Sequence, residues 1–292
     1  PLPPPPWAPS LDPPGVVRWG RVREMMEAQP NITDSTNPHT EPLPHHDITF
    51  HNVSLQLDNR PLIQHLNLTI PTGTTLGITG PTGCGKSLLA ALTARLIDPT
   101  EGHITLGSIP LPELPLDTIR QKIGCALQEP ILFSRTLEHN LAFGLSQPNP
   151  DRIAWATQTA HLDQDIQRFP DQLQTLLGER GVTLSGGQRQ RTAIARAIAR
   201  QPEILILDDV LSAVDTQTEA AIMQKLKPII DERTTLFISH RISTLQYADT
   251  IIVIEDGQIT QQGSHQQLLQ QSGYDAQLHA QQNLKQQLEQ NP

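Results

Sequence analysis

A glycine-rich loop that ends in a lysine and a serine is the segment of this sequence best suited to bind phosphate. It reads GPTGCGKS and consists of Gly80, Pro81, Thr82, Gly83, Cys84, Gly85, Lys86 and Ser87. Glycines allow backbone conformations that a Cβ forbids, so successive N–H groups can turn onto phosphate oxygens. The lysine adds positive charge, and the serine hydroxyl is a suitable ligand for Mg²⁺. We therefore expect this loop to hold the β- and γ-phosphates of a nucleotide.

Two consecutive acids follow an apolar run further along the chain. The run Ile204 to Leu207 has the length and branching of a strand buried on both faces of a parallel sheet. Asp208 would lie at the carboxyl end of that strand, where open α/β sheets bind ligands, and could hold Mg²⁺ through water. Asp209 would then lie beside the γ-phosphate. The alternative for Asp209 is an acid that caps a helix or stands in a loop.

A second potential phosphate-binding surface is the segment LSGGQ, which ends in Ser185, Gly186, Gly187 and Gln188. The serine and the paired glycines are expected to begin a helix that continues to about Arg200. They would present free N–H groups, a hydroxyl and the positive end of the helix dipole to an anion. One chain cannot easily fold this surface onto its own phosphate loop. A second chain is therefore expected to complete each site.

These motifs, in this order, resemble the nucleotide-binding domain of ATP-binding-cassette (ABC) transporters, and the resemblance covers about Asp47 to Gln282. It implies ATP and Mg²⁺ as cofactors. Gln128, in CALQEP, matches the family's glutamine loop, which touches Mg²⁺ and the attacking water. Asp215, in SAVD, matches the loop that crosses to the partner subunit. His240, in FISHR, matches the switch histidine that contacts the γ-phosphate, although a solvated or packed histidine is the alternative when that residue is taken by itself.

The resemblance extends to a subfamily. GERG at Gly178 to Gly181 and the segment Glu129 to Gly144 resemble exporters whose membrane half is fused in front of the ATPase. LGITGPTGCGKS and ILILDDVLSAVD look most like one subunit of the bacterial heterodimeric multidrug exporters. The implied partners are a second ABC subunit and a transmembrane domain, and the implied location is the cytoplasmic face of the bacterial inner membrane. The transported compound, expected to be a drug or lipophilic molecule, would contact the membrane half and not this chain.

Asp209 departs from the family pattern, which has a glutamate as the catalytic base at this place. A carboxylate withdrawn by about an ångström from the attacking water can lose on the order of a hundredfold in rate. We therefore expect this chain's own ATP site to be slow, and its LSGGQ segment to complete the fast site of a different, glutamate-bearing partner. The alternative is an ATP-binding regulatory module with negligible turnover. An ABC ATPase of chromosome maintenance is excluded, because only about a hundred residues separate Ser87 from Leu184 and leave no room for a long coiled coil.

A second departure concerns the adenine base. The family stacks the base on an aromatic side chain at the end of the first strand, whereas this sequence has Leu57 there. Apolar contact remains, but aromatic stacking worth about 0.5 to 1.5 kcal/mol is absent. Weaker discrimination among purine nucleotides is expected.

Composition agrees with a reduced, cytoplasmic ATPase. The 292 residues suffice for one two-lobed domain, and a net charge of −9 without a basic patch argues against nucleic acid as a partner. Two cysteines, Cys84 and Cys125, are too few for a disulfide framework. No apolar run approaches the length of about 20 residues needed to span a bilayer, and the start does not resemble a signal peptide.

The predicted fold class is α/β: a P-loop NTPase core with a parallel sheet, an antiparallel β lobe and a helical signature lobe, which is the ABC ATPase fold. The antiparallel strands are expected at Ile48 to Leu57, Leu66 to Ile70 and His103 to Leu106, and the parallel strands near Thr75, Ile123, Ile204, Thr234 and Ile251. The helical lobe is expected over Pro150 to Gln174.

Three regions are expected along the chain. Residues 1–44 are rich in proline and predict a linker, with a possible helix over Val16 to Ala28, that remains from the connection to a missing transmembrane domain. Residues 45–285 form the nucleotide-binding domain, and residues 286–292 form a tail. Leucines at helical spacing between Gln266 and Gln290 favour a packed terminal helix there.

Overall fold

The computed structural model describes residues 23, 26–27, 30–43 and 45–290, with side chains at the C-terminal end described as far as residue 282. The chain divides into two compact units, Pro1–Thr33 and Asp34–Pro292. The helix expected over residues 16–28 lies almost wholly outside the described residues. In the second unit the Asp34 carboxylate accepts a hydrogen bond from the Leu116 N–H at 2.7 Å. A residue before position 45 thus contacts the rest of this unit, and the domain boundary at residue 45 stays a prediction.

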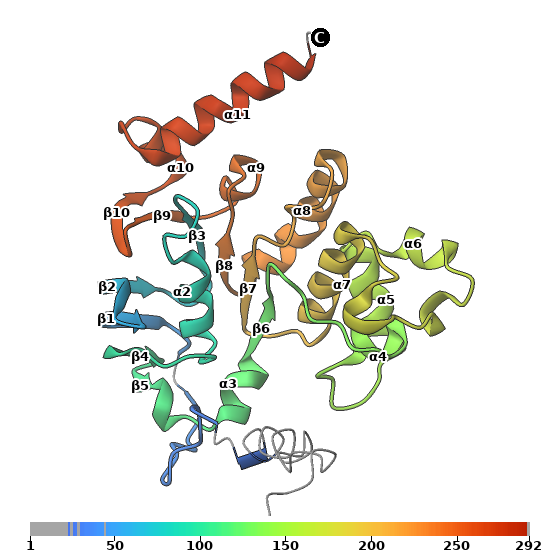
Figure 1. Cartoon of the computed structure of the whole chain (residues 1–292), viewed down its shortest axis with the longest axis horizontal. Coiled ribbons are helices and arrows are strands. Elements are labelled where there is room, and N and C mark those ends of the chain that lie inside the picture. The colour runs from blue at the N-terminus through green and yellow to red at the C-terminus, as the bar shows by residue number, and fades with distance from the viewer. Residues whose placement is uncertain (1–22, 24–25, 28–29, 44, 291–292) are drawn as a thin grey trace, which may run out of the picture. The chain divides into compact units, whose positions relative to one another are not determined.

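A six-stranded sheet forms the centre of the second unit (Figure 1). Its order is β10-β9-β3-β8-β7-β6, in which β10 alone runs antiparallel to its neighbour. The bounds are β3 (Thr75–Thr79), β6 (Ile123–Ala126), β7 (Ile204–Asp208), β8 (Thr234–Ile238), β9 (Thr250–Glu255) and β10 (Gln258–Gly263). The five parallel strands are those that the sequence predicts, so the parallel core is confirmed.

The three central strands are buried along their whole length. Every residue of β3, β7 and β8 is buried, because helices or the second sheet cover both faces. Continuous apolar runs suit such strands, whereas an alternating pattern would leave polar side chains in the core. Parallel pairing also brings the carboxyl ends of these strands to one edge of the sheet.

A four-stranded antiparallel sheet forms a separate lobe, in the order β2-β1-β4-β5. It consists of β1 (Ile48–Leu57), β2 (Arg60–Ile70), β4 (Glu101–Leu106) and β5 (Ile109–Pro110). The predicted antiparallel lobe is confirmed, but β2 begins at Arg60 and not at Leu66. The intervening turn explains the difference: Asp58 and Asn59 have φ values of 49° and 59°, and positive φ at both central residues is the type I′ geometry that favours a tight hairpin.

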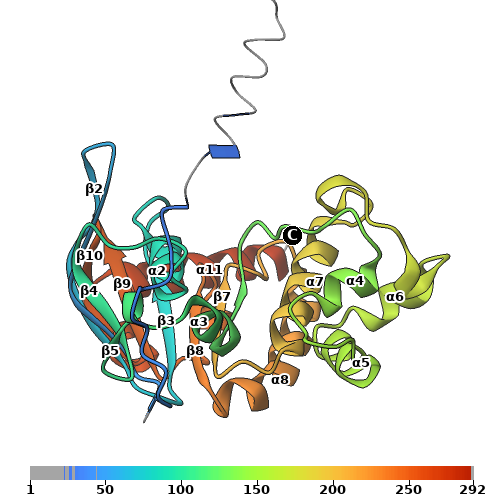
Figure 2. The ribbon, with the colours of Figure 1, turned by 90° about the horizontal axis from the view of Figure 1, so that it is seen from below.

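Helix α2 (Lys86–Thr93) packs between the two sheets (Figure 2). Its Leu89 and Leu92 are fully buried and belong to the same apolar cluster as Phe50 of β1 and Ile78 of β3. The phosphate loop that precedes α2 is therefore anchored on a rigid helix. Helix α3 (Leu116–Lys122) leads directly into β6.

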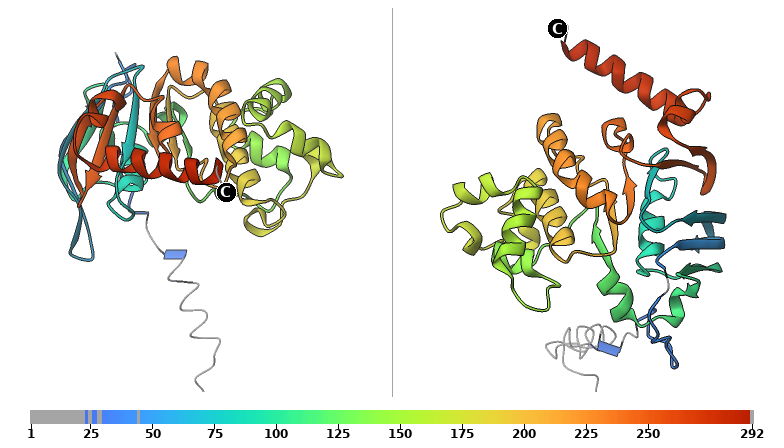
Figure 3. Two further views of the ribbon diagram at one scale, coloured as in Figure 1. Left: turned by 90° about the horizontal axis from the view of Figure 1, so that it is seen from above. Right: turned by 180° about the vertical axis from the view of Figure 1, so that it is seen from behind.

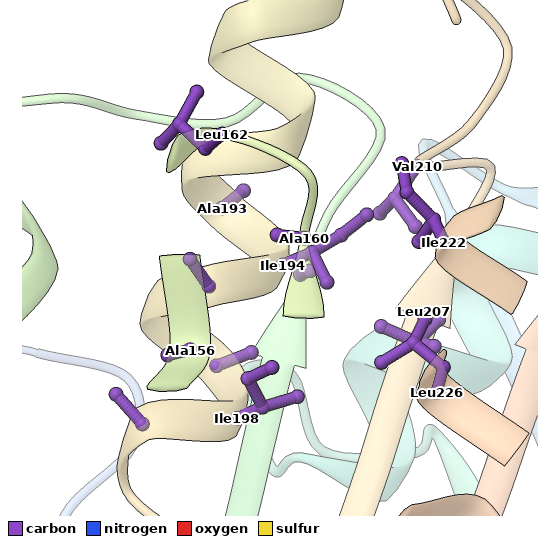
Figure 4. Packing of buried hydrophobic residues seen from close by; sticks show 14 of the residues in the cluster. Ala156, Ala160, Leu162, Ala193, Ile194, Ile198, Leu207, Val210, Ile222 and Leu226 are labelled. Atoms are coloured by element: carbon purple, nitrogen blue, oxygen red, sulfur yellow. The ribbon is translucent and has the colours of Figure 1, made fainter. Parts of the chain in front are cut away.

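The remaining core lies in a helical lobe beside β6 and β7. Its helices are α4 (Leu137–Ala142), α5 (Pro150–Thr159), α6 (Asp163–Arg168), α7 (Gly186–Ala199) and α8 (Thr216–Asp231). Figure 4 shows small side chains, Ala156 and Ala193, where α5 meets α7. On the sheet side, Leu226 of α8 packs against Leu207 of β7. The helical lobe predicted over residues 150–174 is confirmed, as is the helix predicted from Ser185 to about Arg200.

The C-terminal segment forms two helices where the sequence predicts one. These are α10 (His265–Leu269) and α11 (Tyr274–Gln290), and the latter extends beyond α9 (Ile242–Leu245) in Figures 1 and 3. The break falls at Ser272 and Gly273 before Tyr274, where serine and glycine disfavour helix continuation. Leu268 is fully buried and Leu278 packs against its cluster. In the described part of the chain, no helix has the length and apolar character to cross a bilayer.

Candidate functional site

The phosphate loop opens into a pocket of about 260 Å³ at the carboxyl edge of the sheet. The pocket is lined by Thr82, Gly83, Gly85, Lys86, Ser87, Leu88, Gln128, Asp208, Asp209, Ile238 and His240. The structure thus brings the phosphate loop together with the predicted glutamine, both predicted acids and the predicted histidine. These residues come from the ends of four different strands, which only the parallel sheet places side by side.

Two positions in the loop require glycine, because a Cβ would clash with the backbone at Gly80 and because the φ of Gly85 is in the left-handed region. Gly80 has φ +143°, and a Cβ there would lie 2.1 Å from the Ile254 carbonyl oxygen. Gly85 caps α2 with φ 104° in the left-handed region, which L-residues with a Cβ adopt only at a cost. The loop can therefore wrap closely around a ligand at the positive end of α2.

The Lys86 ammonium is held against the loop itself. Its Nζ donates hydrogen bonds to the carbonyl oxygens of Gly80 at 2.9 Å and Pro81 at 2.7 Å. The residue is only 7% exposed, so its charge acts in a partly desolvated environment. A phosphate group that enters the loop would meet a positioned cation.

Asp208, the last residue of β7, is suited to a hard metal ion. It is buried, and its Oδ1 accepts no hydrogen bond from any described residue. Burial raises the pKa of this carboxyl group, and a hydrogen bond from Ser87 opposes part of that rise. Carboxylate, hydroxyl and amide oxygens from Asp208, Ser87 and Gln128 are the ligand types that Mg²⁺ prefers. The pocket therefore fits a Mg²⁺ ion brought in with nucleotide phosphates.

Asp209 occupies a sharp turn directly after β7. Its φ is +46°, and its N–H donates to the Ile238 carbonyl oxygen at 2.8 Å. Burial raises the pKa of its carboxyl group, and the positive charge of Arg241 is the largest effect that lowers it. Aspartate enters the left-handed region more readily than most residues because its short polar side chain bonds locally. The turn itself is thus compatible with the shorter acid.

His240 also lines this pocket and lies two residues after β8. Burial lowers the pKa of its imidazole, and the Lys86 charge lowers it further, while Asp208 opposes this shift. This lowered pKa favours the neutral ring, which has one N–H to donate. This state suits a hydrogen bond to a phosphate oxygen.

The lining of this pocket includes no residue of the signature segment Leu184–Gln188. Ser185 caps α7: its Oγ accepts from the Gln188 N–H at 3.2 Å, and the Gln188 side chain accepts from the Ser185 N–H at 2.9 Å. The Gln188 amide also donates to Asp165 at 2.8 Å. This capping uses the N–H groups of Ser185 and Gln188. It does not use the N–H groups of Gly186 and Gly187, which also stand at the start of the helix.

The two signature glycines have different surroundings. A Cβ on Gly187 would lie 2.9 Å from the Ala213 carbonyl oxygen, so this position requires glycine for packing within the chain. A Cβ on Gly186 would make only ordinary contact, at 3.5 Å from the Ala213 methyl group. No close contact within the described chain requires glycine at residue 186.

Two other predicted residues also lie outside the phosphate pocket. Asp215 caps α8 by accepting a hydrogen bond from the Thr218 N–H at 2.9 Å, and hydrogen bonds from Thr218 lower the pKa of its carboxyl group. Leu57 ends β1 with 63% of its surface exposed. Their roles in nucleotide binding stay predictions.

Sequence reasoning missed two side chains that hold the loop between β7 and α8. Gln190 of α7 donates to the Ser212 hydroxyl at 2.8 Å and accepts from the Ala213 N–H at 2.9 Å. Arg241 donates to the Ser212 carbonyl oxygen at 3.0 Å and pairs with the buried Glu219. Gln190 follows the signature motif and Arg241 follows His240, but no spacing in the sequence indicates that both reach the same loop.

Comparisons with known proteins show the family of this chain. A family model described as "ABC transporter" matches residues 63–212. The uncharacterized ABC transporter ATP-binding protein YwjA of Bacillus subtilis is 40% identical over 271 residues, which are 92% of this chain and 47% of that protein. The B. subtilis protein named "Probable multidrug resistance ABC transporter ATP-binding/permease protein YheI" is 40% identical over 87% of this chain and 44% of its own length.

A solved structure of an ABC exporter is also similar to this chain. The "Structure of a bacterial Atm1-family ABC exporter with ATP bound" superposes with a TM-score of 0.86 at 33% identity, over 92% of this chain and 48% of that chain. The described chain therefore has the ABC ATPase fold that the sequence predicts. It spans about half the length of the relatives it matches.

Replacing Lys86 by methionine is expected to weaken Mg-ATP binding about ten- to a hundredfold, because a hydrogen bond to a charged group contributes about 1.5–3 kcal/mol. Calorimetric titration of the full chain measures this. Lys122→Met is the matched control, since Lys122 pairs with Glu203 and does not line the pocket. Equal losses in both variants would contradict the assignment of Lys86.

Replacing Leu57 by tyrosine is expected to improve the preference for ATP over GTP about two- to tenfold, because an aromatic contact adds about 0.5–1.5 kcal/mol. Competition binding of the two nucleotides to the parent and the variant provides the measurement. Identical selectivity in the two proteins would show that Leu57 is not at the base.

Proposed function

Because this chain belongs to the ABC transporter family, we propose that it is the ATP-binding and ATP-hydrolysing part of an ABC exporter. In this proposal it works as half of a heterodimer at the cytoplasmic face of a bacterial inner membrane. Its own ATP site is slow, and its signature segment completes the fast site of a glutamate-bearing partner. The names of relatives such as YheI motivate multidrug or lipophilic compounds as the exported class.

The observation that carries the proposal is the separation of two phosphate-binding surfaces within one chain. The pocket beside Lys86 includes no residue of the signature segment Leu184–Gln188. The N–H groups at the start of α7, by contrast, lie on a surface where Gly186 leaves room for an outside ligand. Each surface alone is half of a site, and two chains that face each other would join them.

Within the pocket, each side chain has a distinct role in this proposal. Lys86 and the loop N–H groups bind the phosphates, and Ser87, Asp208 and Gln128 hold Mg²⁺, which would neutralise phosphate charge. Asp209 orients the attacking water and accepts its proton as a weak base. The neutral His240 donates a hydrogen bond to the γ-phosphate as its charge develops. ATP bound between the two chains holds them together, and hydrolysis releases them.

The slow turnover follows from the length of one side chain. Asp209 has the burial and position of a catalytic base, but its carboxylate ends one methylene short of a glutamate. General-base catalysis depends on hydrogen-bond reach, so an added ångström to water is costly. An intact signature segment beside a shortened acid suits an asymmetric pair better than two identical subunits.

An exposed apolar groove supports a membrane partner. Its volume is about 480 Å³, and it is lined by Leu96, Ile131, Phe133 and Phe143 together with arginines of α3 and α7. Ile131 is 71% exposed and Leu96 is 55% exposed, which is unusual for large aliphatic side chains beside a core. This chain spans less than half of a relative named as an ATP-binding/permease protein. We assign the groove to a short helix of a permease half, which would insert apolar side chains between Ile131 and Phe143.

Replacing Asp209 by glutamate tests the slow-site proposal. We expect ATP turnover of the chain paired with its partner to rise at least tenfold, since the longer side chain restores the reach of the base. Asp209→Asn, which cannot accept a proton, is the control and should lower turnover further. No gain from glutamate, with unchanged thermal stability, would instead favour an ATP-binding regulatory module.

Replacing Ile131 by glutamate tests the groove. In membranes that contain the permease half, we expect this variant to wash off at least tenfold more readily, because a charge cannot enter an apolar contact without a partner. Leu176→Glu is the matched control, since Leu176 is 69% exposed and lies outside the groove. Equal retention of both variants and the parent would exclude the groove as the docking site.

A further inference from the structure

The C-terminal helix α11 reaches the loop that carries His240. We infer that Gln282 of α11 is a positioning residue for His240, which it holds through the carbonyl group of His240 and the N–H group of Ile242. The inference rests on the proposed role of His240 at the γ-phosphate. It gives a function to the glutamine-rich C-terminal segment, which does not line the phosphate pocket.

Both ends of the Gln282 carboxamide are used in this contact. Its Nε2 donates to the carbonyl oxygen of His240 at 2.5 Å, and its Oε1 accepts from the N–H of Ile242 at 3.0 Å. A single planar amide thus spans the peptide groups on either side of Arg241. Such a two-point contact fixes the direction of the backbone as well as its position, which one hydrogen bond alone would not do.

The contact also supplies a helix cap that the local sequence lacks. Helix α9 begins at Ile242, and its N-cap residue, Arg241, makes no capping hydrogen bond with its side chain. The N–H groups of a first helical turn have no partner within the helix and need an acceptor from elsewhere. Gln282, 40 residues further along the chain, provides that acceptor for Ile242.

Gln282 is brought to this place by a stripe of contacts along one face of α11. Asp275, Leu278 and Gln282 are spaced i, i+3 and i+7, which puts them on the same side of a helix. Asp275 is fully buried and accepts from the His265 ring at 3.2 Å, and Leu278 packs on the cluster around Leu268. The start of α11 is therefore fixed two turns before Gln282, so the side-chain amide of Gln282 has little conformational freedom.

The His240 loop is also held from its own side of the fold, where the Arg241 side chain donates to the Ser212 carbonyl oxygen and pairs with Glu219. Arg241 donates its N–H to the Ser239 hydroxyl at 3.0 Å, and Ser239 donates its N–H to Ile78 at 3.2 Å. These bonds fix the start of the loop at the end of β8. The peptide group that follows His240 is fixed by Gln282, so loss of that contact would let the ring drift relative to the phosphate pocket.

Replacing Gln282 by leucine, in the full chain, removes both hydrogen bonds and keeps the size of the side chain. We expect amide hydrogen exchange of the segment around Ile242 to become about tenfold faster. We expect kcat for ATP to fall about three- to tenfold while the KM for Mg-ATP stays within about twofold, since displacement of a catalytic group affects the transition state more than binding. Gln281→Leu is the matched control, because Gln281 is the exposed neighbour on the same helix.

These measurements test separately whether Gln282 makes the two hydrogen bonds and whether it positions His240. Unchanged exchange at Ile242 in Gln282→Leu would overturn the contact, and faster exchange with unaltered kcat would overturn the positioning role. Partial recovery of exchange protection in Gln282→Glu, which keeps the acceptor for Ile242, would support the cap. A parent chain that binds Mg-ATP but never turns it over would contradict the proposed function instead, and the exchange measurement would still decide the contact.

Discussion

The parallel pairing of β3, β8 and β7 is the constraint on which the site depends. Ile78 of β3 pairs with Ile238 of β8, and Ile238 pairs with Asp208 of β7, so the three strands end at one level. The phosphate loop, the acids and His240 therefore emerge side by side although they are far apart in sequence. Because the strands are buried on both faces, a slip in register would move a charged residue into the apolar core and is strongly disfavoured.

The sequence predicted the phosphate loop and the two acids of the pocket from strand and loop signals, whereas it indicated Gln128 and His240 through the family resemblance. Continuous apolar runs indicated β7 and β8, and glycines with a lysine indicated the loop before α2. The order of strands was not predictable, since periodicity reports burial and not neighbours. The same holds for Gln190, Arg241 and Gln282: their bonds to backbone groups cross long sequence separations, and a polar residue in a helix reads as solvated until its partner is known.

Asp209 is subject to two opposing requirements. The turn after β7 places it at φ +46°, where aspartate is tolerated better than glutamate because its carboxylate is close to its own backbone. A catalytic base, on the other hand, gains from the extra methylene. In a chain whose proposed task is to complete the site of another subunit, the conformational requirement can outweigh the catalytic one. The shorter acid then stabilises the conformation of the turn, and the rate of ATP hydrolysis is lower.

That turn begins the loop 209–215, which two lobes hold from opposite sides. Gln190 belongs to the helix that would face the partner's ATP, whereas Arg241 adjoins the histidine that would face this chain's own ATP. Both side chains bond the same Ser212, one at its hydroxyl and the other at its carbonyl oxygen. A shift of either lobe must therefore move the loop or break one of these hydrogen bonds. Because Gln282 bonds the backbone on both sides of Arg241, polar contacts connect the two proposed nucleotide surfaces through Arg241, Ser212 and Gln190.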